Sequence, residues 1–196
     1  MIKKLATFII FAGIVLIWIS CFQYYKTIEA QKNSLKEAYK ILDIDNQTAK
    51  EKPTMKNEKE QFNPHQGDTV GILEIPKLGA ELPIVEGTAD DDLEKGVGHY
   101  QGTAYPTQKD QIVLSGHRDT VFRRMGELKI GDILIIKLAY GSFAYKIDST
   151  KIVKANDQTI IKSTAPEEEL ILTTCYPFTY VGSAPNRYIL TAKPVE

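Results

Sequence analysis

The chain has 196 residues, and 24 lysines and arginines stand against 25 aspartates and glutamates. This balance leaves no basic excess, so the composition does not favour nucleic-acid binding. The apolar fraction of 43% is ordinary for a globular protein, and the length suits one domain with additional segments.

The first additional segment is an uncharged apolar run from Leu5 to Phe22. As a helix it would be roughly 27 Å long, close to the hydrocarbon thickness of a bilayer. Lys3 and Lys4 precede the run and favour an inside N-terminus, which places the rest of the chain outside the cell. Aromatic residues follow at the expected outer interface: Trp18, Tyr24 and Tyr25.

We interpret residues 1–25 as an uncleaved signal anchor with a single pass through the cell membrane. A cleaved signal peptide would need a small-x-small cleavage site, and none is convincing here. A lipoprotein signal ending at Cys21 would carry Trp18 where such signals have a small aliphatic residue. A buried soluble helix is disfavoured because the run is apolar on all faces.

Residues 26–66 are polar, mixed in charge and rich in lysine. Ile28, Leu35, Tyr39 and Leu42 form a thin helical stripe, which predicts that the anchor helix continues to about Leu42. A flexible tether is expected to follow as far as residue 66. A partner-binding helix is the alternative interpretation of this segment.

From residue 67 to 196, short β-type runs alternate with turns rich in Gly, Pro, Asp and Asn. Many short strands at close spacing predict a mainly β domain, either a sandwich or a barrel. Two short helices are expected, near Asp90–Lys95 and Val121–Leu128. The expected strands are Val70–Ile75, Leu82–Glu86, Gln111–Ser115, Asp132–Leu138, Phe143–Val153, Leu170–Thr174 and Tyr188–Ala192.

Three residues at strand ends are candidates for chemistry. Cys175 ends an apolar strand and is the only cysteine outside the N-terminal run. Its thiolate would be a nucleophile, and a nearby cation would stabilise it. His117 follows another strand and could serve as general acid and base. Arg187, at the start of the last strand, could donate hydrogen bonds to an oxyanion.

Each of these residues also has a structural interpretation. A lone cysteine in a β domain is more often a small core residue, a lone histidine is often structural, and a lone arginine is often a solvated surface group. His99 competes with His117 as the base, and the residues alone do not separate the two. His65 falls in the predicted tether and is expected to be inert.

The sequence predicts neither a metal site nor another cofactor. Scattered histidines and one cysteine give no pair of ligands at a usable spacing. The acidic group at Asp90, Asp91, Asp92 and Glu94 is expected to begin a helix rather than to bind calcium.

The strand-end motifs resemble those of sortases, the cysteine transpeptidases of Gram-positive cell surfaces. The family's Thr-Leu-x-Thr-Cys signature is similar to Ile171-Leu172-Thr173-Thr174-Cys175, with isoleucine in the first position. The segment Ser115–Phe122, followed by Gly131-Asp132, resembles the family's histidine motif, and Arg187 matches the family arginine. The resemblance spans roughly Gly71 to Ala192 and is strongest to class D.

The resemblance implies a closed β-barrel of about eight strands with two or three short helices, behind an N-terminal membrane anchor. It also implies a mechanism. Cys175 would attack the threonine carbonyl of a Leu-Pro-x-Thr-(Gly or Ala) sorting signal, Arg187 would bind the oxyanion, and His117 would move the proton. A thioester acyl-enzyme would then pass the surface protein to an amine of a cell-wall (peptidoglycan) precursor. By the same resemblance, Thr174 is expected to line the substrate cleft, and no obligatory metal is expected.

Two other functions remain open from the residues. A non-catalytic surface adaptor would use the barrel as a binding module and would bury an unreactive Cys175. A cysteine hydrolase would use the same nucleophile but would transfer the acyl group to water instead of to an amine.

Overall fold

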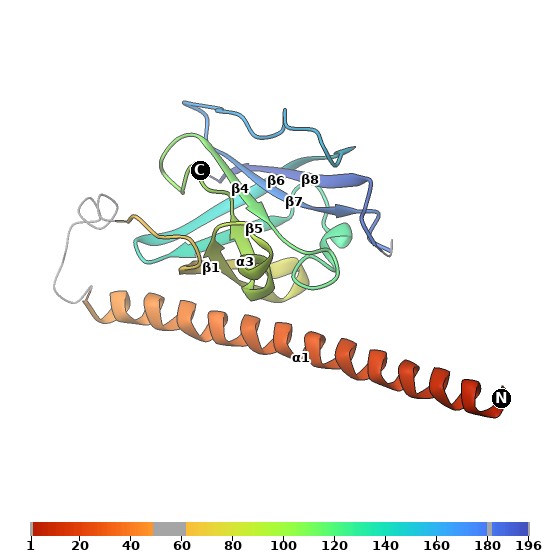
Figure 1. The fold of residues 1–196 in the computed structure, drawn as a ribbon. Coiled ribbons are helices and arrows are strands. Elements are labelled where there is room, and N and C mark those ends of the chain that lie inside the picture. The colour runs from red at the N-terminus through yellow and green to blue at the C-terminus, as the bar shows by residue number, and fades with distance from the viewer. Residues whose placement is uncertain (1, 49–61, 180–181, 196) are drawn as a thin grey trace.

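The computed structural model describes residues 2–48, 62–179 and 182–195, in which eight strands close into a barrel beside one long helix (Figure 1). The strands follow one another around the barrel in the order β1-β2-β3-β4-β7-β8-β6-β5. Their bounds are β1 Thr69–Ile75, β2 Ala80–Glu86, β3 Val97–His99, β4 Gln111–Ser115, β5 Ile133–Leu138, β6 Gly141–Lys154, β7 Glu169–Tyr176 and β8 Asn186–Pro194.

Alternate side chains of these strands fill the barrel interior, as the period of a strand requires. The interior is apolar and includes Leu73 of β1, Leu114 of β4, Leu172 of β7 and Leu190 of β8, each at most 1% exposed. The predicted mainly β fold with a closed barrel of about eight strands is therefore confirmed.

A second, smaller apolar cluster lies on the outer face of β4, β7 and β8. It contains Val113, Ile171, Ile189 and Ile160, with Val153 packed against it. Ile160 comes from the long connection between β6 and β7, which covers this face. Because the middle of each of β4 and β7 is buried on both faces, residues 112–114 and 170–172 are apolar without alternation.

The remaining elements differ from expectation in places. The helix α3 (Asp90–Lys95) has the predicted bounds, whereas the segment near Val121–Leu128 contains only the short 3-10 helix η2 (Met125–Glu127). A second 3-10 helix, η1, spans Pro76–Leu78. Strand β3 was missed because its three residues follow one glycine and include another, which carries no strand signal. Pairing with β2 on one side and β4 on the other makes it a strand.

Helix α1 runs from Ile2 to Thr48, which is longer than the predicted end near Leu42. It contains a stretch that is long and apolar enough to cross a membrane. Figure 1 shows its N-terminal part projecting past the barrel, while its second half lies alongside β1 and α3. The predicted tether falls largely at residues 49–61, outside the described residues.

Asp110 anchors the end of the β6–β7 connection, just before β7 begins. Its carboxylate accepts hydrogen bonds from the backbone N–H groups of Thr164 (2.6 Å) and Gln111 (2.8 Å) and from the Ser163 hydroxyl (3.0 Å). These donors, with the Thr164 N–H contributing most, hold the pKa of Asp110 below its ordinary value of 3.8.

The stabilisation that the Asp110 carboxylate gives to the β6–β7 connection should depend on pH. Because the folded-state pKa is lowered, the stabilisation is complete above pH 3.8 and is lost as the pH falls through the lowered pKa. The Thr164 amide resonance should therefore titrate in an NMR experiment with a midpoint below 3.8. In Asp110→Asn this step should vanish, whereas a midpoint at or above 3.8 in the unmodified chain would contradict the assignment.

Candidate functional site

The parallel pairing of β4 and β7 brings two of the candidate residues to one edge of the barrel. Ser115 is the register partner of Thr173, and the Gly116 N–H extends the ladder by donating to the Thr173 carbonyl at 3.1 Å. His117 and Cys175 each follow two residues later. Since neighbouring strands lie about 4.8 Å apart, this register places the two residues side by side.

The antiparallel pairing of β7 and β8 brings the third. Cys175 and Arg187 are direct register partners, so their Cα atoms are roughly 5 Å apart. Both side chains lie on the outer face, because each is two residues along its strand from a member of the outer pair Thr173 and Ile189. Cys175 therefore sits between the histidine and the arginine.

These residues line one open cleft of about 780 Å³. Its floor is the outer face of β4, β7 and β8, where Val113, Thr173 and Ile189 contribute side chains. One wall comes from the β6–β7 connection, including Ile160 and Ile161, and the opposite wall comes from the start of α3 and the preceding loop. The volume is in the range of pockets that bind small molecules and short peptides.

The segment from 116 to 124, here termed the histidine loop, folds back tightly after β4. The Phe122 N–H donates to the His117 carbonyl at 3.0 Å. A Cβ at position 116 would lie 2.6 Å from the Phe122 ring and 2.7 Å from Val121, so only glycine allows this close approach. The glycine before His117 is therefore part of how the imidazole is placed.

Thr174 joins the histidine loop to the cysteine strand from the inside. Its hydroxyl donates to the Gly116 carbonyl at 2.6 Å, and the residue is 3% exposed. Thr174 is among the residues that border the cleft. A direct contact of its hydroxyl with substrate stays a prediction, since the hydroxyl already has a backbone partner.

Arg187 and Arg118 hold the other side of the site. The Arg187 Nη1 donates to the carbonyls of Asn186 (3.1 Å) and Ala184 (3.3 Å), which keeps the guanidinium over its own strand end. The Arg118 Nη2 donates to the Gly182 carbonyl at 2.7 Å and so ties the histidine loop to the β7–β8 connection. This hydrogen bond of Arg118 was not predicted from the sequence, in which its position directly after His117 was the available signal.

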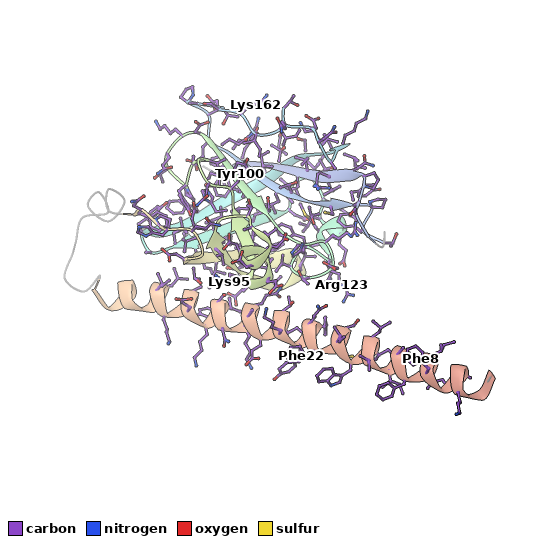
Figure 2. All side chains as sticks on the ribbon, viewed as in Figure 1. Phe8, Phe22, Lys95, Tyr100, Arg123 and Lys162 are labelled. Carbon is purple, nitrogen blue, oxygen red and sulfur yellow. The ribbon has the colours of Figure 1, made fainter. Side chains whose placement is uncertain are left out.

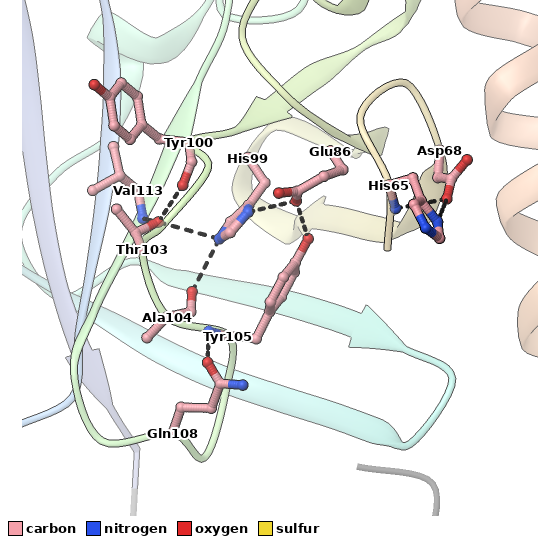
Figure 3. Close-up of polar contacts among 10 residues, drawn as sticks. All are labelled: His65, Asp68, Glu86, His99, Tyr100, Thr103, Ala104, Tyr105, Gln108 and Val113. Atoms are coloured by element: carbon pink, nitrogen blue, oxygen red, sulfur yellow. Dashed lines mark hydrogen bonds and ion pairs between the residues drawn. The ribbon is translucent and has the colours of Figure 1, made fainter. Parts of the chain in front are cut away.

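His99, the competing base, lies elsewhere and is buried at 1% exposure. Its Nδ1 is 2.7 Å from Glu86 Oε2, and its Nε2 is 3.0 Å from the Ala104 carbonyl and 3.2 Å from the Thr103 hydroxyl (Figure 3). The Tyr105 ring stacks on the imidazole, and its hydroxyl donates to the same Glu86 oxygen.

The partners of His99 fix where its hydrogens lie. A carbonyl only accepts, and the Thr103 hydroxyl already donates to the Tyr100 carbonyl, so Nε2 must carry a hydrogen. A second proton then lies between Nδ1 and Glu86, because a lone pair facing a carboxylate would repel it. His99 and Glu86 thus form a buried unit with no net charge and no nitrogen free for catalysis.

Burial also raises the pKa of Tyr105 far above its ordinary value, with further increases from the hydrogen bond and the charge of Glu86. His65 is exposed and contacts Asp68 at 3.6 Å. In contrast to both, the His117 ring and the Cys175 sulfur make no hydrogen bond within the described part of the chain, and both face the cleft. Of the three histidines, His117 is the one beside the thiol.

No group of three or more His, Cys, Asp or Glu side chains is placed to hold a metal ion among residues 2–48, 62–179 and 182–195. Among the side chains that line the cleft are a thiol, an imidazole and a guanidinium.

Comparison with known proteins gives consistent matches. A family model described as a sortase domain matches residues 73–195. Sortase D of Bacillus subtilis (strain 168) is 53% identical over 196 residues, which covers 98% of each chain. The solved Sortase D5 transpeptidase of Clostridium perfringens superposes with a TM-score of 0.72 over 86% of this chain and 99% of that chain, at 24% identity. A sortase C from Clostridium perfringens SM101 superposes with a TM-score of 0.62 at 29% identity, over 88% and 90% of the two chains.

The geometry of His99 predicts a structural and not a catalytic defect on its removal. His99→Ala leaves the buried Glu86 without its ionic partner and with the Tyr105 hydroxyl as its remaining donor, which should lower the free energy of unfolding by about 3–5 kcal/mol. Chemical denaturation measures this loss, and Glu86→Gln should give a smaller one because it leaves no buried charge. A variant of unchanged stability with a slowed reaction at Cys175 would instead make His99 the base.

Proposed function

The chain belongs to the sortase family, and from this premise we propose that it is a cysteine transpeptidase that joins surface proteins to a cell-wall amine. The substrate would carry a Leu-Pro-x-Thr-(Gly or Ala) signal near its C-terminus, and cleavage would follow the threonine. The observation that carries the proposal is the single cleft in which Cys175 stands between His117 and Arg187.

The first half-reaction forms the acyl-enzyme. The Cys175 thiolate, stabilised by its cationic neighbours, attacks the threonine carbonyl. Arg187 donates hydrogen bonds to the oxygen that becomes negative in the tetrahedral intermediate. The peptide C–N bond then breaks, His117 gives its proton to the departing amine, and a thioester on Cys175 remains.

The second half-reaction reverses these roles. An amino group of a peptidoglycan precursor attacks the thioester carbonyl, and His117 takes the proton that the amine loses. The C–S bond breaks, Cys175 leaves as the thiolate, and an amide links the surface protein to the acceptor. The exchange conserves one acyl bond at each step, so it needs no cofactor.

The outer face of the barrel supports peptide binding at this place. The cleft floor is apolar where Val113, Ile160 and Ile189 meet, and it becomes polar toward Cys175. An extended peptide could place apolar side chains on the floor and its scissile carbonyl at the sulfur. The long apolar helix supports membrane anchoring, and the reaction that we propose requires the barrel to be on the outer side.

Replacement of the nucleophile gives the first test of this function. Cys175→Ala should abolish the thioester adduct that mass spectrometry detects with a signal peptide, while the fold is kept. His117→Ala should slow turnover by about 10²–10⁴-fold, as expected for loss of general acid–base catalysis. Normal turnover by the Cys175 variant would exclude the mechanism.

The same assay separates transfer from hydrolysis and from mere binding. With an added amine, a transpeptidase should yield the amide product at the expense of the free acid. A product that stays the free acid would favour the hydrolase, and a Cys175 that thiol reagents cannot reach would favour the adaptor.

Replacement of the arginine tests the oxyanion contact. Arg187→Ala should lower kcat by about 10²–10³-fold, the usual cost of losing one such donor. Arg187→Lys keeps the charge but not the planar fork, so it should recover only part of the rate. If alanine changed KM alone, Arg187 would bind the ground-state peptide and not the developing oxyanion.

A further inference from the structure

Helix α1 consists of two parts with different surroundings. Large apolar side chains from Phe8 to Tyr25 are exposed, as suits a segment that a bilayer would cover. Figure 2 shows Phe8 and Phe22 on this apolar part of the helix. The stripe of half-buried and buried positions that faces the barrel domain begins at Thr27, five residues after the apolar run ends at Phe22.

The second part of α1 is docked along one stripe. The buried and half-buried positions recur every three or four residues, as one helix face requires: 27, 30, 31, 34, 35, 38, 41 and 42. Ser34 and Ala38 are small and at most 6% exposed, which allows close approach to the barrel. Polar contacts fix the register, because the Thr69 hydroxyl donates to Glu37 at 2.8 Å and the Tyr39 hydroxyl donates to Glu81.

The cleft lies at the end of the barrel that is nearest to the apolar part of α1. Lys26 contacts Glu94 of α3 at 3.4 Å. A small hollow is lined on one side by Gln23, Lys26 and Thr27 and on the other by Glu94 and the histidine loop. His117 borders both this hollow and the cleft, so the catalytic edge is adjacent to α1 residues 23–27.

The opposite end of the barrel contacts α1 much closer to the C-terminus of the helix. Glu37 and Ile41 share a hollow with Val70 and with Ala139 of the β5–β6 turn. The fourteen residues that separate position 23 from position 37 correspond to about 21 Å along the helix axis. The barrel therefore has a near end and a far end with respect to the apolar part of α1, and the cleft belongs to the near end.

We propose that the face formed by α3 and the histidine loop rests on the lipid headgroups of the bilayer, and that docked α1 is the rigid strut that holds it there. Trp18, Tyr24 and Tyr25 mark the interfacial level of α1, and His117 lies beside residues 23–27. The strut would present the cleft to polypeptides anchored in the same membrane. This last step rests on the proposed transpeptidase function, whereas the orientation does not.

A depth measurement tests the orientation without any activity. In full-length chain carrying Cys21→Ser and Cys175→Ala, one dye is attached through Asp119→Cys or through Ala139→Cys. In vesicles that contain lipid with a nitroxide on the headgroup, the dye at 119 should be strongly quenched and the dye at 139 weakly. Equal quenching, or stronger quenching at 139, would overturn the proposal.

Undocking α1 tests the role of the strut. Ala38→Arg places a charged side chain at a fully buried position of the helix face, whereas Asn33→Arg adds the same group at an exposed one. The first should remove the difference in quenching and the second should keep it. Lys26→Gly with Thr27→Gly, which loosens the helix between its two parts without changing the barrel, should also remove it.

Turnover in vesicles completes the test. The same signal peptide is offered free in solution and attached to a lipid of the vesicle. Ala38→Arg and the glycine pair should lower turnover of the lipid-attached peptide by about tenfold through lost effective concentration, and leave the free peptide unchanged. Equal losses on both peptides would mean that α1 supports the barrel rather than its orientation. If no variant, including the unmodified chain, turns over either peptide, the proposed function fails and the depth measurement alone decides the orientation.

Discussion

The site depends on the parallel pairing of β4 with β7. These strands are separated in the chain by β5 and β6, so nothing local brings them together. Once they pair, the register that aligns Ser115 with Thr173 also aligns the residues two positions beyond each. The antiparallel partner β8 then adds Arg187 opposite Cys175. A shift of one residue in either pairing would turn a side chain to the opposite face and separate the group.

Burial of β7 on both faces explains how a reactive edge can be rigid. Leu170 and Leu172 belong to the barrel core, whereas Ile171 belongs to the outer cluster beneath the β6–β7 connection. The strand is clamped between two apolar layers up to the point where Cys175 emerges. On the inner side, the Thr174 hydroxyl bonds the Gly116 carbonyl, and the neighbouring His99–Glu86 unit is neutral and sealed from solvent. The Thr174 hydroxyl and the His99–Glu86 unit thus have internal partners, whereas the thiol and the imidazole face the cleft.

Much of this could be predicted from the sequence, and the failures have physical causes. The long strands, α3 and the apolar helix follow from periodicity and composition, which act over a few residues. Strand β3 was missed because its pairing with β2 and β4, and not its own three residues, makes it a strand. The polar part of α1 was expected to be a thin amphipathic helix, yet its buried stripe is centred on the small residues Ser34 and Ala38, which hydrophobic patterns do not reveal.

The sequence by itself determined the mainly β class, the apolar N-terminal helix and the short set of residues able to carry chemistry, because residue type and local pattern limit these directly. It did not distinguish His99 from His117, since each is an imidazole that directly follows a glycine. Only the tertiary structure separates their surroundings. Partners distant in the chain bury and saturate His99, whereas the β4–β7 register leaves His117 open beside Cys175. The docking of α1 was decided in the same way, by a surface that exists only after the barrel has closed.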